Sequence, residues 1–136
     1  MHSQIIIQNI FDCDELSPYL TDLLTEVMSK INAFIDLDET DFSFLYEGRT
    51  SSGEIAEVTE DGDLYIDTKK LKQIGNRNAE TALLAHECAH IVLRHYATET
   101  IGLEKEDEAD ELAASWGFDI TLFRKLCGPA TVKKYV

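Results

Sequence analysis

The stretch HECAHIVLRH, residues 86–95, holds three of the four histidines in this chain of 136 residues. In an α-helix, residues four positions apart lie one above the other on the same face. His86 and His90 therefore project in the same direction, and one ring nitrogen from each can reach a single ion. Zinc takes neutral imidazole ligands at about 2.0–2.1 Å, so this spacing predicts a metal site on a helix.

Glu87 adds a base to the histidine pair. It follows His86 directly, so it is too close in sequence to join the same row of ligands, but it can reach a water molecule that the metal activates. A metal lowers the pKa of such a water towards neutrality, and a carboxylate can take its proton. The resulting His-Glu-x-x-His pattern is the one found in zinc proteases.

The residues around His86 and His90 indicate a metal site rather than a chance match to the pattern. ALLA precedes His86 and IV follows His90, so this helix is predicted to be largely buried. Three ionisable groups on a buried helix cost on the order of several kcal/mol unless they are paired or bound to metal. A metal site explains their presence better than ordinary core packing does.

A catalytic zinc also needs a third protein ligand. The metzincin arrangement would place a histidine ten residues after the first, where this chain has Tyr96. His95 comes one residue early, at the predicted helix end, where a histidine also suits a C-terminal cap. His95 is kept as an alternative ligand, and His95, Tyr96 and Tyr65 are the candidates for a donor to the developing oxyanion.

The acidic stretch LEKEDEADEL, residues 103–112, offers a ligand on a following helix. Glu106 and Asp110 are four residues apart and share one face, beside small alanines that let two helices approach closely. Glu106 can bind the metal, while Asp110 can accept the second ring N–H of a ligand histidine. Glu108 flanks the same apolar face on its other side and stays an alternative third ligand.

Composition limits the partners of the chain. Lys and Arg number 12 and Asp and Glu 26, so the formal net charge is 12 − 26 = −14. Such a surface repels nucleic-acid backbones and anionic membranes, and it attracts basic partners.

No apolar run suits a signal peptide or a membrane span, and three widely spaced cysteines fit free thiols in a reducing compartment. The expected location is the cytoplasm, with neither a nucleic-acid nor a membrane partner.

Hydrophobic periodicity predicts a single domain over residues 1–136. A first helix is predicted at 16–35, with Ser17 as its N-cap and Pro18 at the first helical position. Thr68 is expected to cap a short turn, and Asn76 or Asn78 the second long helix. Alternating residues predict three strands, 42–47, 55–59 and 64–67, the last two joined by a hairpin turn at 61–62. A loop is predicted at 98–102, and further helices at 79–96, 103–116 and 119–127. This order is typical of an α+β domain.

Taken together, HECAH and EDEAD resemble the gluzincin class of zinc metallopeptidases. The chain is most similar to ImmA/IrrE-type metallopeptidases and minigluzincins, which often combine HExxHxxxxH with a later E-x-E-A-(N/D)-x-(F/L)-A-A. The resemblance covers roughly residues 64–116. It implies a zincin-like domain in which a small, mainly antiparallel three-stranded sheet packs on the active-site helix and the glutamate helix. It also implies a Zn²⁺ ion, with Glu106 as the third ligand and Asp110 as the partner of a ligand histidine.

The function that the resemblance implies is that of a zinc metallo-endopeptidase, a hydrolase acting on a cytoplasmic protein such as a regulatory repressor. Glu87 would be its catalytic base. The protein or peptide substrate would bind along an edge strand of the sheet, expected in DGDLYIDT, residues 61–68. The alternative is a non-catalytic zincin-like interaction module of a phage or mobile element, against which the presence of Glu87 speaks. No oligomeric state is predicted.

Overall fold

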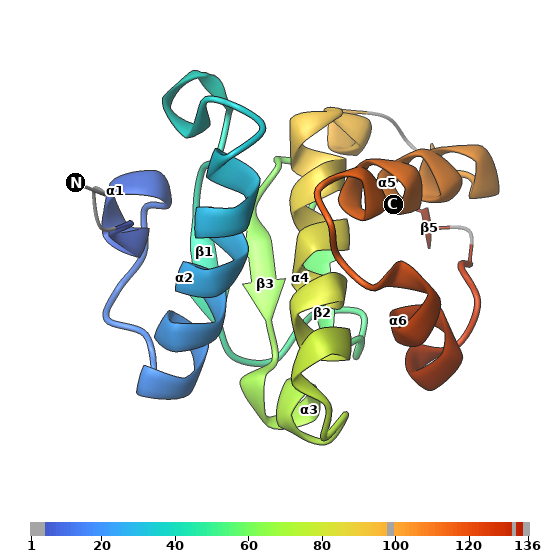
Figure 1. Ribbon diagram of the computed structural model, residues 1–136, viewed down its shortest axis with the longest axis horizontal. Helices are drawn as coiled ribbons and strands as arrows, with labels where there is room; N and C mark the ends of the chain where they lie inside the picture. Colours follow the sequence, from blue (N-terminus) through green and yellow to red (C-terminus); the bar gives the residue numbers. More distant parts are fainter. Residues whose placement is uncertain (1–4, 98–99, 132, 135–136) are drawn as a thin grey trace.

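The computed structural model describes residues 5–97, 100–131 and 133–134 (Figure 1). Its α-helices are α1 (Ile7–Ile10), α2 (Pro18–Asn32), α3 (Thr68–Lys72), α4 (Arg77–Val92), α5 (Leu103–Ser115) and α6 (Ile120–Cys127). Two short 3-10 helices are η1 (Leu37–Glu39) and η2 (His95–Ala97). The strands are β1 (Leu45–Glu47), β2 (Ala56–Val58), β3 (Leu64–Ile66), β4 (Thr100–Ile101) and β5 (Lys133–Lys134). The α+β class is confirmed.

The main sheet has the strand order β1-β3-β2. Strands β2 and β3 form the predicted antiparallel hairpin, whose turn contains Gly62 with a φ of 84°. Strand β1 pairs with β3 in parallel, with Tyr46 opposite Tyr65. The expectation of a mainly antiparallel sheet is therefore wrong, because only one of these two pairings is antiparallel. Strands β4 and β5 form a separate two-stranded sheet that was not predicted; part of the loop expected at 98–102 lies outside the described residues.

Helices α2 and α4 cover one face of the main sheet, and α5 and α6 lie on the far side of α4 (Figure 1). The core between these layers includes Met28 of α2, Leu64 and Ile66 of β3, and Cys88 of α4, all with no exposed surface. Helix α4 is the central element, because it contacts α2, α5, α6 and β2. None of the helices in the described parts of the chain combines the length and the apolar character needed to cross a membrane.

The start of α2 is fixed as predicted. Ser17 is the N-cap, its hydroxyl oxygen accepts a hydrogen bond from the Leu20 amide at 3.3 Å, and Pro18 opens the helix. Glu47 at the end of β1 secures this corner, because its carboxylate accepts from the Ser17 amide at 2.8 Å and the Ser17 hydroxyl at 2.5 Å. The same carboxylate accepts from the Thr68 hydroxyl at 2.5 Å. One side chain thus joins β1 to the starts of α2 and α3.

The caps of the next two helices differ in part from expectation. Asp67, not Thr68, caps α3, since its carboxylate accepts from the Lys70 amide, while the Thr68 hydroxyl is used by Glu47. Asn76 caps α4 by accepting from the Ala79 amide at 3.1 Å. This cap fixes the residue at which α4 begins.

We expect Glu47→Gln to lower the free energy of unfolding by about 1–2 kcal/mol at pH 7. Burial raises the pKa of Glu47, but the hydrogen bonds from Ser17 and Thr68 outweigh burial and hold the pKa below its ordinary value. A carboxylate with a lowered folded-state pKa stabilises the fold above its unfolded pKa, and this contribution is lost as the pH falls through the folded value. The deficit of the variant should therefore shrink below about pH 4.5.

Urea unfolding of both proteins between pH 7 and pH 3 measures this deficit. The same substitution at the exposed Glu60 is the control and should cost little at any pH. A deficit of constant size down to pH 3 would show that the ionised form of Glu47 is not what stabilises the corner.

Candidate metal centre

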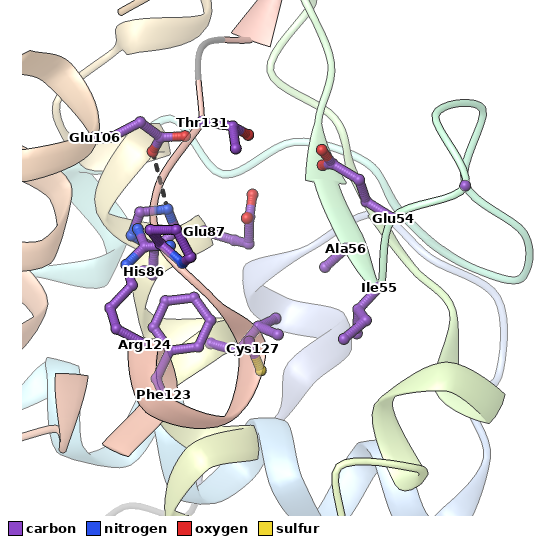
Figure 2. Close-up of a pocket in the computed structure, with 13 residues that line it drawn as sticks. Glu54, Ile55, Ala56, His86, Glu87, Glu106, Phe123, Arg124, Cys127 and Thr131 are labelled. Carbon is purple, nitrogen blue, oxygen red and sulfur yellow. Dashed lines mark ion pairs between the residues drawn. The ribbon is translucent and has the colours of Figure 1, made fainter. Parts of the chain in front are cut away.

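Two neighbouring helices bring His86, His90 and Glu106 to one point. Nε2 of His90 lies 3.1 Å from Nε2 of His86 and 2.6 Å from Oε2 of Glu106. The same Glu106 oxygen lies 3.0 Å from Nε2 of His86, the contact dashed in Figure 2. All three residues are buried. These are the three residues predicted as metal ligands. His86 and His90 lie one helical turn apart on α4, and Glu106 lies in the first turn of α5.

The donor set fits a metal ion. Two imidazole nitrogens and one carboxylate oxygen can converge in this way only if a proton or a cation lies among them. Ligand atoms about 2 Å from a tetrahedral zinc ion are roughly 3.3 Å apart, which is about 0.2–0.7 Å more than the distances of 3.1, 3.0 and 2.6 Å in this cluster. The group of His86, His90 and Glu106 can therefore hold a metal ion with only a small outward movement.

The electrostatics of the cluster favour positive charge. Burial lowers the pKa of His86, but its contacts with Asp110 and Glu106 more than offset burial and raise the pKa to about 9. Burial raises the pKa of Glu106, yet the bonds from His86 and His90 hold it well below its ordinary range. An ionised carboxylate is thus present at neutral pH among the ring nitrogens.

Asp110 supports the cluster from the next turn of α5. Its Oδ1 lies 2.7 Å from Nδ1 of His86, a close charge contact that lacks hydrogen-bond geometry. Arg124 of α6 holds the carboxylate in place, because its Nε and Nη2 each donate to Asp110 at 2.9 Å. Asp110 therefore lies where it was predicted, beside the second nitrogen of a candidate ligand.

His95 does not continue the row of histidines. The helix predicted to run to residue 96 ends at Val92, and Arg94 has a φ of 57°, a left-handed conformation that turns the chain back. Nδ1 of His95 then meets Nδ1 of His90 at 2.9 Å, on the side of that ring facing away from the cluster. The structure thus corrects the predicted end of the helix, because His95 lies outside α4, and it places His95 beside the nitrogen of His90 that faces away from the cluster.

Glu108 is also separated from the cluster. Its side chain is about half exposed, at 51%, and its nearest contact to a histidine is 3.9 Å to Nε2 of His95. Glu108 therefore lies beside His95. Glu106 is the carboxylate that contacts the rings of both His86 and His90.

The tyrosines considered as oxyanion donors lie elsewhere. Tyr96 packs against the hairpin turn, so closely that a Cβ at Gly62 would be 2.9 Å from its ring. Tyr65 projects from the sheet face opposite to α4 and stacks on Tyr46 at 4.7 Å. Neither borders the pocket described next, so the structure does not support either as a donor.

A pocket of about 340 Å³ opens beside the histidines (Figure 2). Its walls are residues 53–56 at the start of β2, Leu83, His86 and Glu87 of α4, Glu106, and residues of α6 and the segment after it. Glu87 is the one residue between Ala79 and Ile91 that is not buried. In Figure 2 it lies between His86 and β2. The predicted base therefore lines the pocket, together with Leu83 and His86 of the same helix.

The strand beside the pocket is not the one expected. The stretch 61–68 contains β3, which lies in the middle of the main sheet, between β1 and β2. Strand β2 is at the end of this sheet, and Ile55 and Ala56 line the pocket. The difference arises from the long-range parallel pairing of β1 with β3, which covers the side of β3 that would otherwise be an edge.

Residues of α6 form a part of the site that the sequence did not predict. The ring of Phe123 lies 5.5 Å from that of His86, Arg124 binds Asp110, and Cys127 lines the pocket. Phe123 has the spacing of an ordinary core residue, and no local pattern links Arg124 to an aspartate 14 residues earlier. Only the tertiary packing of α6 against α4 and α5 brings them together.

Comparison with known proteins adds no relative. No protein-family model, curated protein or solved structure matches the chain. The likeness to gluzincins therefore stays a prediction from the motif residues.

We expect Ala109→Leu to lower the free energy of unfolding by about 1–3 kcal/mol and to weaken metal binding. Ala109 has no exposed surface, and a larger side chain there would push α5 and Glu106 away from α4. Ala114→Leu on the exposed side of the same helix is the matched control. Urea unfolding and zinc titration measure both effects, and equal losses in the two variants would contradict the close packing.

Proposed function

We propose that this protein is a zinc-dependent metallo-endopeptidase with a zincin-like fold. The observation that carries the proposal is the convergence of His86, His90 and Glu106 beside Glu87, which lines the pocket and is the one residue between Ala79 and Ile91 that is not buried. A buried cluster alone fits a structural metal site. A carboxylate next to it, facing a pocket, is what hydrolysis adds to metal binding.

In the proposed mechanism His86, His90 and Glu106 hold the zinc ion. Zinc bound there would lower the pKa of a water molecule and polarise the carbonyl of a peptide bond. Glu87 would accept a proton from that water as the water oxygen bonds to the carbonyl carbon, and it would deliver this proton to the amine nitrogen as the C–N bond breaks. Asp110, itself fixed by Arg124, keeps the His86 ring oriented.

The proposed substrate is an extended segment of a cytoplasmic protein, for which a regulatory repressor fits the family resemblance. Strand β2 borders the pocket at the end of the sheet, where an added strand would give affinity through main-chain hydrogen bonds. Ile55, Leu83 and Phe123 line the same pocket and favour an apolar substrate side chain. All three cysteines are free, which suits a reducing compartment.

Metal content tests the proposal. After gentle purification we expect about one zinc per chain, retained in Glu108→Gln and lost in His90→Ala and Glu106→Gln. The two glutamates lie on one helix, and only Glu106 contacts both ligand rings. A wild-type protein without bound metal would overturn the proposal, and loss of zinc from Glu108→Gln alone would assign the third ligand differently.

A further inference from the structure

The sheet face opposite to α2 and α4 carries an aromatic row made of Phe44, Tyr46 and Tyr65. Alternation along the strands directs Leu45, Leu64 and Ile66 into the core and these rings to the other face. The rings of Phe44 and Tyr46 are stacked with centroids 6.1 Å apart, and those of Tyr46 and Tyr65 at 4.7 Å. Phe44 is 42% exposed and Tyr46 43%.

Leaving such a row of rings exposed to solvent lowers the stability that the fold could otherwise gain. Burying a large apolar side chain stabilises a fold by about 1.5–3 kcal/mol. Phe44 and Tyr46 gain only part of this stabilisation, because each is about half exposed. Contiguous exposed aromatic residues are typical of binding surfaces, whereas single ones are common and need no explanation. Nothing in the proposed hydrolysis requires the row, because it lies on the side of the sheet away from the helix that carries His86.

Carboxylates border the aromatic row. The backbone of Asp12 runs beside β1, with its amide donating to the Ser43 carbonyl at 2.9 Å. Residues 12–16 and 44–47 line a groove of about 450 Å³ that includes Asp14. The pKa of the Tyr46 phenol is raised by partial burial and then by the charges around it, including Asp63, Asp12 and Asp14. Aromatic faces and negative charge therefore share one surface.

We propose that the aromatic row and its acidic border form a docking surface for a lysine- and arginine-rich segment of a partner protein. Cations stack on exposed aromatic faces with about 0.5–1 kcal/mol each, and the neighbouring carboxylates pair with the same cations. The formal charge of −14 attracts a basic segment. The same charges repel nucleic acids and anionic membranes, so the surface selects a cationic peptide.

The probe is a ten-residue peptide of alternating arginine and serine, titrated against the full chain and followed by amide NMR shifts. We expect the largest shifts at residues 12–14, 44–47 and 63–66, and affinity that falls as salt is raised. A peptide with glutamate in place of arginine should not bind. Shifts centred on α5, or binding of the glutamate peptide, would overturn the proposal.

Ring variants test the aromatic contribution. Tyr46→Ala should weaken binding of the arginine peptide at least threefold, while Tyr46→Phe, which keeps the ring, should bind nearly as well as the wild type. Phe34→Ala is the matched control, because Phe34 is a 58% exposed aromatic residue outside the row. Equal affinity for Tyr46→Ala and the wild type would show that the rings do not take part.

Charge variants distinguish the effect of the acidic border on peptide binding from the effect of the overall charge. Asp12→Asn with Asp14→Asn removes two negative charges at the row, and Glu104→Gln with Asp107→Asn removes two from the exposed face of α5. Only the first pair should weaken binding. Equal weakening by both pairs would reduce the effect to net charge and overturn the proposal. Neither outcome bears on zinc content or hydrolysis.

Discussion

Replacing Glu87 by glutamine is expected to abolish peptide hydrolysis while leaving zinc bound. The carboxamide has nearly the size of the carboxylate but cannot accept a proton, and general-base catalysis typically contributes about 10²–10⁴-fold to the rate. Glu87 is not among the residues that converge as ligands, so the metal site should survive the change. Degradation of a loosely folded protein such as casein, followed together with zinc content, measures both properties.

The same substitution at Glu111, on the exposed side of α5, is the control and should leave the rate unchanged. Two results would contradict the assignment. Equal rates for wild type and Glu87→Gln would remove Glu87 from the mechanism. A wild type that binds zinc and is as inert as the variant across many substrates would favour a non-catalytic interaction module.

Removal of zinc is expected to lower the melting temperature of the protein by on the order of 10 °C. A ligand that binds only the folded chain stabilises it by about 4 kcal/mol at a thousandfold excess over its dissociation constant. The cluster makes this contribution large, because chelation leaves His86, His90 and Glu106 buried with one another, Asp110 and His95 as their polar partners. Thermal unfolding with and without a strong chelator measures the shift.

Glu106→Gln gives the matched reference for this measurement. Lacking one ligand, it should melt at the same temperature with and without chelator. If the chelator lowered the melting temperature of the variant by the same amount, the stabilising metal would lie at another site. If it did not change the melting temperature of a zinc-loaded wild type, metal binding would not stabilise the fold.

Local signals in the sequence predicted most helices and the convergence of His86, His90 and Glu106. Ser17-Pro18 starts α2, Gly117 follows α5 with a φ of 93°, and Gly128 follows α6 with a φ of 90°. Each of these is a property of a few consecutive residues. The i, i+4 spacing of His86 and His90 is equally local, which is why their common direction could be predicted without knowing the fold.

Features that depend on distant contacts were missed. The parallel pairing of β1 with β3 joins segments separated by the whole β2 strand, and it decided which strand borders the pocket. Arg94 gives no sign in the sequence of its left-handed conformation, since its side chain is long and unlike the glycine usual there. Without that turn, His95 would have continued the helix instead of folding back beside His90.

The candidate metal ligands and the other walls of the pocket come from different parts of the chain. His90 and Glu106 are 16 residues apart, whereas the opposite walls are residues 53–56 and 123–131. Closing a short loop costs little chain entropy, and local contacts form faster than distant ones. We therefore expect the α4–α5 hairpin to bring His86, His90 and Glu106 together early in folding, and the pocket to be completed last.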